Sequence, residues 1–238
     1  MGDLIRAETF RFRKNIRGFL LVCFFALATT FMFGNDEGYA LDRECVGMTG
    51  LMGSMLAGMA MLITVCDAYT QRVQYYEIMA GFRPSRIILS RMAVYLPAGI
   101  AAYFIPYAVM HIIHDGSIEM TKALFFMFIL FVRIALETFF LSPLFKNWTT
   151  LMPFVYILPA MFRPMIEEAF GSPEMFDRSV LGLSSAGQMM QLGGEITTAF
   201  VAKIIISSVL FCIFCYIIGY LTLKRKFSLE VKLTSAYG

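Results

Sequence analysis

Long apolar runs separated by short polar segments dominate the pattern along this chain. A helix that crosses a hydrocarbon core of about 30 Å needs roughly 20 apolar residues, because each residue adds about 1.5 Å of rise. Six runs fit this requirement, and each predicts a transmembrane helix: residues 18–34, 46–66, 92–113, 123–145, 149–165 and 196–223. The fifth run is short and holds several prolines. We therefore expect an all-α membrane protein with a single transmembrane domain over residues 1–238.

Residues 3–17, before the first run, have the pattern of an amphipathic helix. At 3.6 residues per turn Ile5 and Phe12 share one face, while Arg6 and Arg13 share a neighbouring face. A basic amphipathic helix lies along a membrane surface against anionic headgroups. This segment is either an orientation signal and interfacial anchor alone, or also a bearing surface for a soluble partner.

Residues 67–91, between the second and third runs, are longer than a tight turn requires. A helix-like stretch is followed by a break at Gly81 and Pro84, and the pattern predicts a new helix from Ser85. The simpler alternative is a solvated basic loop, which explains the arginines but not the length or the defined break. We expect an elbow that projects from the cytoplasmic side of the membrane.

Composition and charge agree with a membrane protein. Of 238 residues 58% are hydrophobic and 16% charged, against roughly 25% charged in a soluble domain. The net charge of +3 gives no indication of a nucleic-acid partner. We expect both termini to be cytoplasmic, because the cytoplasmic segments then hold most of the 20 lysines and arginines, as the positive-inside rule requires. The longest outside segment is then the extracellular loop 163–195, whose apolar pieces are expected to form short helices on or dipping into the interface.

Two opposite charges lie near the middle of the fourth run. Arg133 and Glu137 are one helical turn apart on the same face, and a charge at the bilayer centre costs on the order of 3 kcal/mol. The pair lies either on a translocation pathway or subunit interface, or in a buried clamp that holds the bundle together. Arginine before glutamate is the weaker order for pairing within a helix, so we expect partners on other helices.

The second run carries small residues on one helical face, including Gly50, Gly53, Ser54 and Gly58. Such a face permits close approach of another helix. The methionines that recur beside it are either flexible filler or an adaptable apolar lining for a lipid-like substrate.

Two further motifs are weak candidates for a cofactor. Cys212 and Cys215 have the spacing of a metal or redox motif, but they lie inside a continuous apolar run. His111 and His114 are the only histidines of the chain and are expected at the interface. We expect no cofactor or metal on this chain.

Three stretches together resemble the membrane subunits of type-2 ABC exporters, in particular the short bacterial permeases linked to bacteriocin self-protection. They are RAETFRFRKN, DAYTQRVQYYEIMAGFRPSRIILSR and GYLTLKRKFSL. In that family the N-terminal helix and the loop between the second and third spans dock on a separate ATPase. The resemblance implies these contact positions here: Glu77, Gly81, Arg83, Ser85, Arg86, Arg6 and Arg13. Pro84 is not part of the family pattern.

The chain lacks the G-x-x-x-x-G-K-[ST] phosphate loop, so ATP and Mg²⁺ are expected on a separate ATP-binding subunit rather than on this chain, which is not itself expected to be an enzyme. The expected function is the permease subunit of an ATP-driven exporter in the bacterial cytoplasmic membrane, paired with a second copy or a paralogue. Its expected substrate is amphipathic or hydrophobic, such as an antimicrobial peptide or a drug. One alternative is an ion-driven secondary transporter or channel that uses Arg133 and Glu137; another is the anchor subunit of a redox complex.

Overall fold

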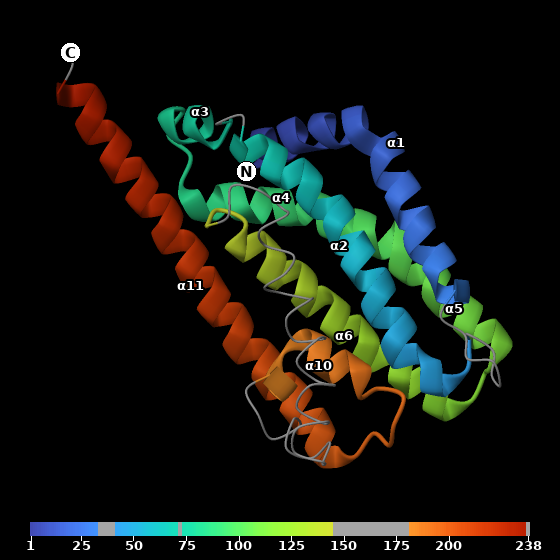
Figure 1. Cartoon of the computed structure of the whole chain (residues 1–238). Helices are drawn as coiled ribbons and strands as arrows, with labels where there is room; N and C mark the ends of the chain where they lie inside the picture. The colour runs from blue at the N-terminus through green and yellow to red at the C-terminus, as the bar shows by residue number, and fades with distance from the viewer. Residues whose placement is uncertain (33–40, 71–72, 145–180, 237–238) are drawn as a thin grey trace.

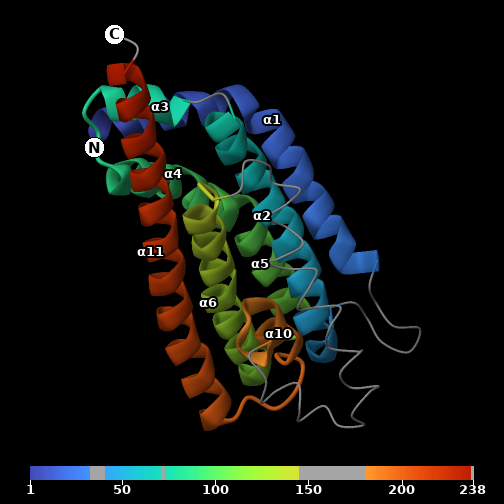
Figure 2. The same ribbon diagram turned by 60° about the vertical axis from the view of Figure 1, so that its left-hand side comes forward.

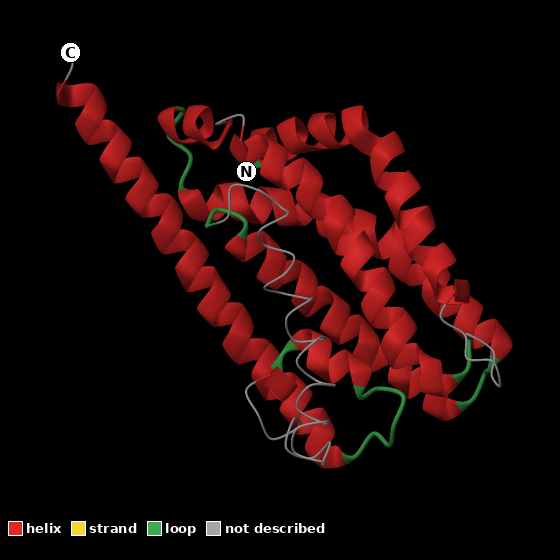
Figure 3. Ribbon diagram, in the orientation of Figure 1, coloured by secondary structure: helices red, strands yellow, loops and turns green. Residues whose placement is uncertain are grey.

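A computed structural model describes residues 1–32, 41–70, 73–144 and 181–236 of the chain. These residues are helical apart from short connections, and no strand occurs among them (Figure 3). The helices are α1 (Gly2–Met32), η1 (Arg43–Cys45), α2 (Val46–Thr70), α3 (Val73–Met79), α4 (Pro84–Gly99), η2 (Ile100–Phe104), α5 (Ile105–His114), α6 (Ile118–Leu141), η4 (Leu181–Leu183), α10 (Ser185–Met190) and α11 (Thr198–Ala236).

Four helical segments are long and apolar enough to cross a membrane: Val46–Ile63, Pro84–His114, Ile118–Leu141 and Thr198–Arg225. They correspond to the second, third, fourth and sixth predicted spans, although the third begins earlier than residue 92 and the fourth earlier than residue 123. The protein is therefore a multi-pass membrane protein built from helices.

The other two predicted spans have a different outcome. The described part of the first, residues 18–32, continues the N-terminal helix as part of α1 but falls short of a membrane-length apolar window within the described residues. The fifth, residues 149–165, lies outside the described residues.

The helices form a bundle with two distinct ends (Figures 1 and 2). The N-terminus, α3 and the last turns of α11 lie at one end, here named the α3 end. The η1 turn, α10 and the start of α11 lie at the other, named the α10 end. In Figure 1 the first part of α1 lies across the α3 end before the helix turns along the bundle.

Helices α2 and α6 form the centre of the bundle. In the apolar stretch of each of these helices 67% of the residues are buried, against 17% in that of α11, so α11 lies at the periphery. Aromatic side chains join the helices. The ring centroids of Phe104 and Phe128 lie 5.0 Å apart, and those of Tyr103 and Phe131 lie 5.7 Å apart. The exposed side of α11 is apolar, as expected for a helix that faces lipid.

The third span contains a local change of helix type. Pro97 lies inside α4 and Pro106 near the start of α5, and between them η2 is a π-helix. A proline removes one backbone donor and crowds the preceding turn, which the wider π-turn accommodates. This wider turn brings Tyr103 into the bundle, where it is fully buried.

Close approach of α11 to α6 depends on Gly219. A Cβ added at this position would collide with the backbone carbonyl of Phe140, which has no rotamer to move aside. We expect Gly219→Ala to lower the free energy of unfolding by about 1–3 kcal/mol, measured as thermal unfolding in detergent. Gly18→Ala is the control, because nothing lies within 4 Å of a Cβ there; alanine should be neutral or stabilising by roughly 0.5–1 kcal/mol in this helix. Equal effects of the two substitutions would contradict this account.

Candidate functional site

The described part of residues 67–91 forms a bend at the α3 end, although α2 continues as far as Thr70. Helix α3 ends at Met79, and Gly81 has a φ of +85°, a conformation that favours glycine. The Phe82 amide donates to the carbonyl of Glu77 at 3.1 Å and closes the end of α3. Helix α4 then begins at Pro84, after Arg83 in an extended conformation. The predicted break at Gly81 and Pro84 is confirmed.

Four charged side chains connect this elbow to the N-terminal helix. Arg91 of α4 donates from Nε to Glu8 Oε1 of α1 and from Nη2 to Glu77 Oε2 of α3, each at 3.1 Å. Arg11 Nη1 donates to Glu8 Oε1 at 2.6 Å and to Glu77 Oε1 at 2.9 Å. Each arginine thus binds both carboxylates, and the four residues, here named the charge ring, join three helices.

The charge ring is largely buried. Arg91 and Glu8 are each 1% exposed and Glu77 is 8% exposed, while Arg11 lies at the rim. Two positive and two negative charges cancel, which is the condition under which buried charges are tolerated. The ring therefore ties the first part of α1, α3 and α4 into one unit.

Sequence reasoning missed Glu8. The predicted apolar face of residues 3–17 holds in part: Phe12 packs against Phe19 and Tyr95. However, the helix face that enters the bundle also contains Leu4 and Glu8, one turn apart, so a carboxylate is buried where a purely apolar stripe was expected. The sequence did offer one indication that Glu8 is buried: it lies one helical turn from both Leu4 and Phe12, on their face of the helix.

The proposed docking residues separate into two groups. Arg6 and Arg13 on α1, with Arg83 and Arg86 at the start of α4, are exposed and form no ion pair within the described residues. These four arginines are named the basic platform. Gly81 is exposed and Ser85 half-buried, whereas Glu77 points into the charge ring. Glu77 is therefore placed to hold the elbow rather than to contact a partner.

A second cluster surrounds Arg133 in the bundle. Its Nε donates to Glu137 Oε1 at 2.6 Å, and its Nη1 donates to Gln188 Oε1 and Ser207 Oγ, each at 2.9 Å. Its Nη2 donates to the carbonyl of Leu183 at 2.8 Å. The predicted partners on other helices are therefore present, and they come from η4, α10 and α11.

The remaining contacts complete this polar cluster, which comprises Arg133, Glu137, Ser185, Gln188 and Ser207. Ser185 Oγ donates to Glu137 Oε2 at 3.0 Å, and the Arg133 guanidinium lies 4.8 Å from the Phe211 ring centroid. Arg133 is 1% exposed and Glu137 6% exposed. A guanidinium bonded on Nε and on both terminal nitrogens has the arrangement of a structural clamp that holds α10 against α6 and α11.

Helix α10 belongs to the predicted loop 163–195, of which residues 163–180 lie outside the described residues. The short helix expected in this segment is present, and its residues from Ser185 to Met189 are buried. A Cβ at Gly47 of α2 would lie 2.6 Å from the carbonyl oxygen of Met189, so α10 enters the bundle closely.

The small-residue face of α2 serves packing. A Cβ at Gly50 would lie 2.5 Å from the Met127 side chain, and one at Gly53 would collide with the Tyr103 hydroxyl. Gly58 and Ser54 are buried as well. Neighbouring side chains of α6 and η2 thus occupy the space that the glycines leave.

The cysteines of the C-x-x-C motif are free thiols, and the two histidines contact the segment before η1. Cys215 is buried and Cys212 half-buried in α11 as free thiols. His111 bonds through Nδ1 to the carbonyl of Leu41 at 2.9 Å, and His114 Nε2 lies 3.0 Å from Asp42 Oδ1. Within the described parts of the chain, no three potential metal ligands come together.

No protein-family model, curated protein or solved structure matches this chain.

Proposed function

We propose that this chain is the permease subunit of an ATP-driven ABC exporter of a bacterial cytoplasmic membrane. The observation that carries the proposal is the charge ring, which joins the N-terminal helix and the elbow to α4, the elements on or next to which the exposed arginines of the basic platform lie. A soluble ATPase that bears on this end of the bundle would contact the two elements that the resemblance assigns to docking.

The route for mechanical coupling is short. Arg91 is the eighth residue of α4, counting from Pro84 as the first, and α4 opens the candidate span Pro84–His114. Because the charge ring holds α1, α3 and α4 as one unit, a displacement of the elbow is passed directly to the third span. ATP binding and hydrolysis take place on the separate subunit, and this chain supplies the docking surface and the membrane pathway, in a dimer with a second copy or a paralogue.

The substrate class follows from the same proposal. The spans are rich in methionine and phenylalanine, 18 and 24 of them in the chain, and flexible apolar side chains suit an amphipathic or hydrophobic substrate. The ion-driven alternative needs a site that exchanges an ion or proton. Arg133 and Glu137 instead bind each other and three further side chains, so no observation favours that alternative.

The basic platform tests the proposal. Tagged chain purified from its native membranes should carry an ATPase, and Arg83→Glu with Arg86→Glu should lower the ATP hydrolysis that co-purifies by at least about tenfold, since reversed charges meet the partner surface. The melting temperature should not change, because both arginines are exposed.

Lys122→Glu is a control for charge reversal at the opposite end of the bundle, since it reverses one exposed cation at the α10 end and should leave the ATPase bound. The proposal fails if the wild-type chain carries no ATPase, or if reversal of Arg83 and Arg86 has no more effect than reversal of Lys122.

A further inference from the structure

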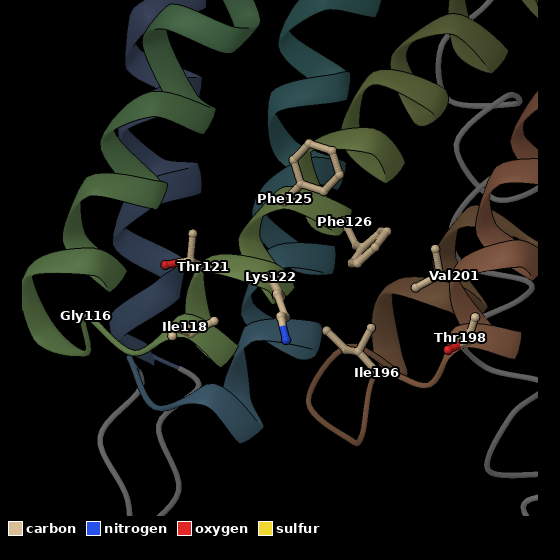
Figure 4. A pocket seen from close by; sticks show the side chains of 9 residues that line it. All are labelled: Gly116, Ile118, Thr121, Lys122, Phe125, Phe126, Ile196, Thr198 and Val201. Atoms are coloured by element: carbon tan, nitrogen blue, oxygen red, sulfur yellow. The ribbon is translucent and has the colours of Figure 1, made fainter.

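A groove between the first turns of α6 and α11 opens at the α10 end (Figure 4). Its volume is about 630 Å³, within the range of about 300–1,000 Å³ usual for ligand sites. Most of its walls are apolar, and they come from α6, from α11 and from the segment before α11. The lining includes Ile118, Phe125, Phe126, Ile196 and Val201. This α6–α11 groove lies where two candidate spans begin, which is the depth of the membrane–water interface.

Lys122 is the cationic side chain among the residues that line the α6–α11 groove. Lys122 lies in the second turn of α6, and in Figure 4 its side chain extends toward the side where Ile196 lies. It is exposed and forms no ion pair or hydrogen bond within the described residues. The acid one turn earlier, Glu119, is bound by Arg43 and so is already neutralised. Glu195, next to Ile196, forms no ion pair with Lys122.

Two further features favour a negative group beside Lys122. Ser117 caps the N-terminus of α6 by accepting from the Met120 amide at 3.1 Å, and the N-terminal end of a helix carries partial positive charge, of which the Asp115 carboxylate, bound to the Ser117 amide and hydroxyl, offsets a part. The hydroxyl-bearing residues Thr121 and Thr198 also line the groove. A ligand with one anionic, hydrogen-bonding group and a long apolar part complements these features together.

We propose that the α6–α11 groove binds an anionic phospholipid of the surrounding bilayer, with its phosphate at Lys122 and an acyl chain along Phe125 and Val201. The exposed apolar side of α11 continues from the groove through Ile205 and Ile206, so a chain longer than the groove stays in contact with apolar surface. This proposal depends on the multi-pass membrane fold alone and stands whether or not the chain works with an ATPase.

Quenching of a tryptophan placed in the groove tests the proposal. The native Trp148 is replaced by phenylalanine, and Phe125→Trp supplies the reporter, at a side chain that is 59% exposed. The full chain is reconstituted in vesicles that contain brominated phosphatidylglycerol or brominated phosphatidylcholine at the same mole fraction. We expect phosphatidylglycerol to be enriched at the reporter by about fivefold, equivalent to the roughly 1 kcal/mol that one basic residue contributes toward an anionic lipid.

The variants separate this site from general lipid contact. Lys122→Gln should remove the preference and Lys122→Arg should keep it, while Arg86→Gln at the α3 end should have no effect. A second reporter, Phe214→Trp on the lipid-facing side of α11, where Phe214 is 61% exposed, should be quenched equally by the two lipids.

Three results would overturn the proposal. One is equal quenching by both lipids at Phe125→Trp, which includes weak quenching by both because another protein surface covers the groove. Another is a preference that survives Lys122→Gln. The third is the same preference at Phe214→Trp, which would mean general enrichment of anionic lipid around the protein.

Discussion

Replacing Arg91 by methionine is expected to lower the free energy of unfolding by about 3–5 kcal/mol. The substitution leaves Glu8 and Glu77 buried, with Arg11 as their only common partner among the described residues, and an uncompensated buried charge has a cost of this size. For a chain of this length the melting temperature should fall by on the order of 10 °C. Thermal unfolding in detergent, followed by the loss of helical circular dichroism, measures the change.

Two variants show whether the charge ring is the cause. Arg86→Met removes an exposed arginine from the same helix and should change stability by less than about 0.5 kcal/mol. The double variant Arg91→Met with Glu77→Gln removes one charge of each sign and leaves Arg11 paired with Glu8, so it should cost less than the sum of the single substitutions. Strictly additive costs, or an Arg91 effect no larger than that of Arg86, would show that the ring does not hold these helices.

Replacing Arg133 by methionine is expected to cost a similar 3–5 kcal/mol and to release α10 from the bundle. Glu137 would be left in the bundle without its cation, the Leu183 carbonyl would lose the Arg133 donor, and Gln188 Oε1 would keep only the donor from Ser207 among the described residues. A cysteine at position 186, introduced in a background without the native cysteines, reports the release. Ala186 is fully buried in the native bundle, so reaction with a maleimide should be slow there and fast in the variant.

The double variant Arg133→Met with Glu137→Leu separates a clamp from a transport pathway. Hydrophobic replacement of a whole buried ion pair is often nearly neutral, so a clamp predicts that stability and protection of position 186 both return. If the double variant remains as unstable as Arg133→Met alone, the ion pair is not what holds α10. If stability returns and transport is lost, the pair belongs to the pathway after all.

Local signals in the sequence predicted the elements well. Apolar runs of membrane length correctly marked four of the helices, because such a run has no other favourable environment. The break in the elbow was equally predictable, since Gly81 and Pro84 act through their own backbone conformations. Arg133 and Glu137 were identified because a charge in an apolar run is conspicuous.

The pairing of distant residues was not predictable in the same way. Glu8 and Arg91 are 83 residues apart, and in the sequence each looks like an ordinary charge of an interfacial segment. Gln188 and Ser207 look like polar residues of a loop and a lipid-facing helix, yet both bind Arg133. The resemblance pointed to Glu77 as a surface contact, and only its neighbours on α1 and α4 place it inside.

By itself the sequence determined that the chain is helical, that it resides in a membrane and where its elbow bends, because these depend on hydrophobicity and backbone preference within a few residues. Only the tertiary structure decided which charges face one another, that α10 enters the bundle and that Lys122 stands in an apolar groove. The reason is that a buried charge is stabilised by whatever lies within a few ångströms of it, and helix packing rather than chain order brings those partners together.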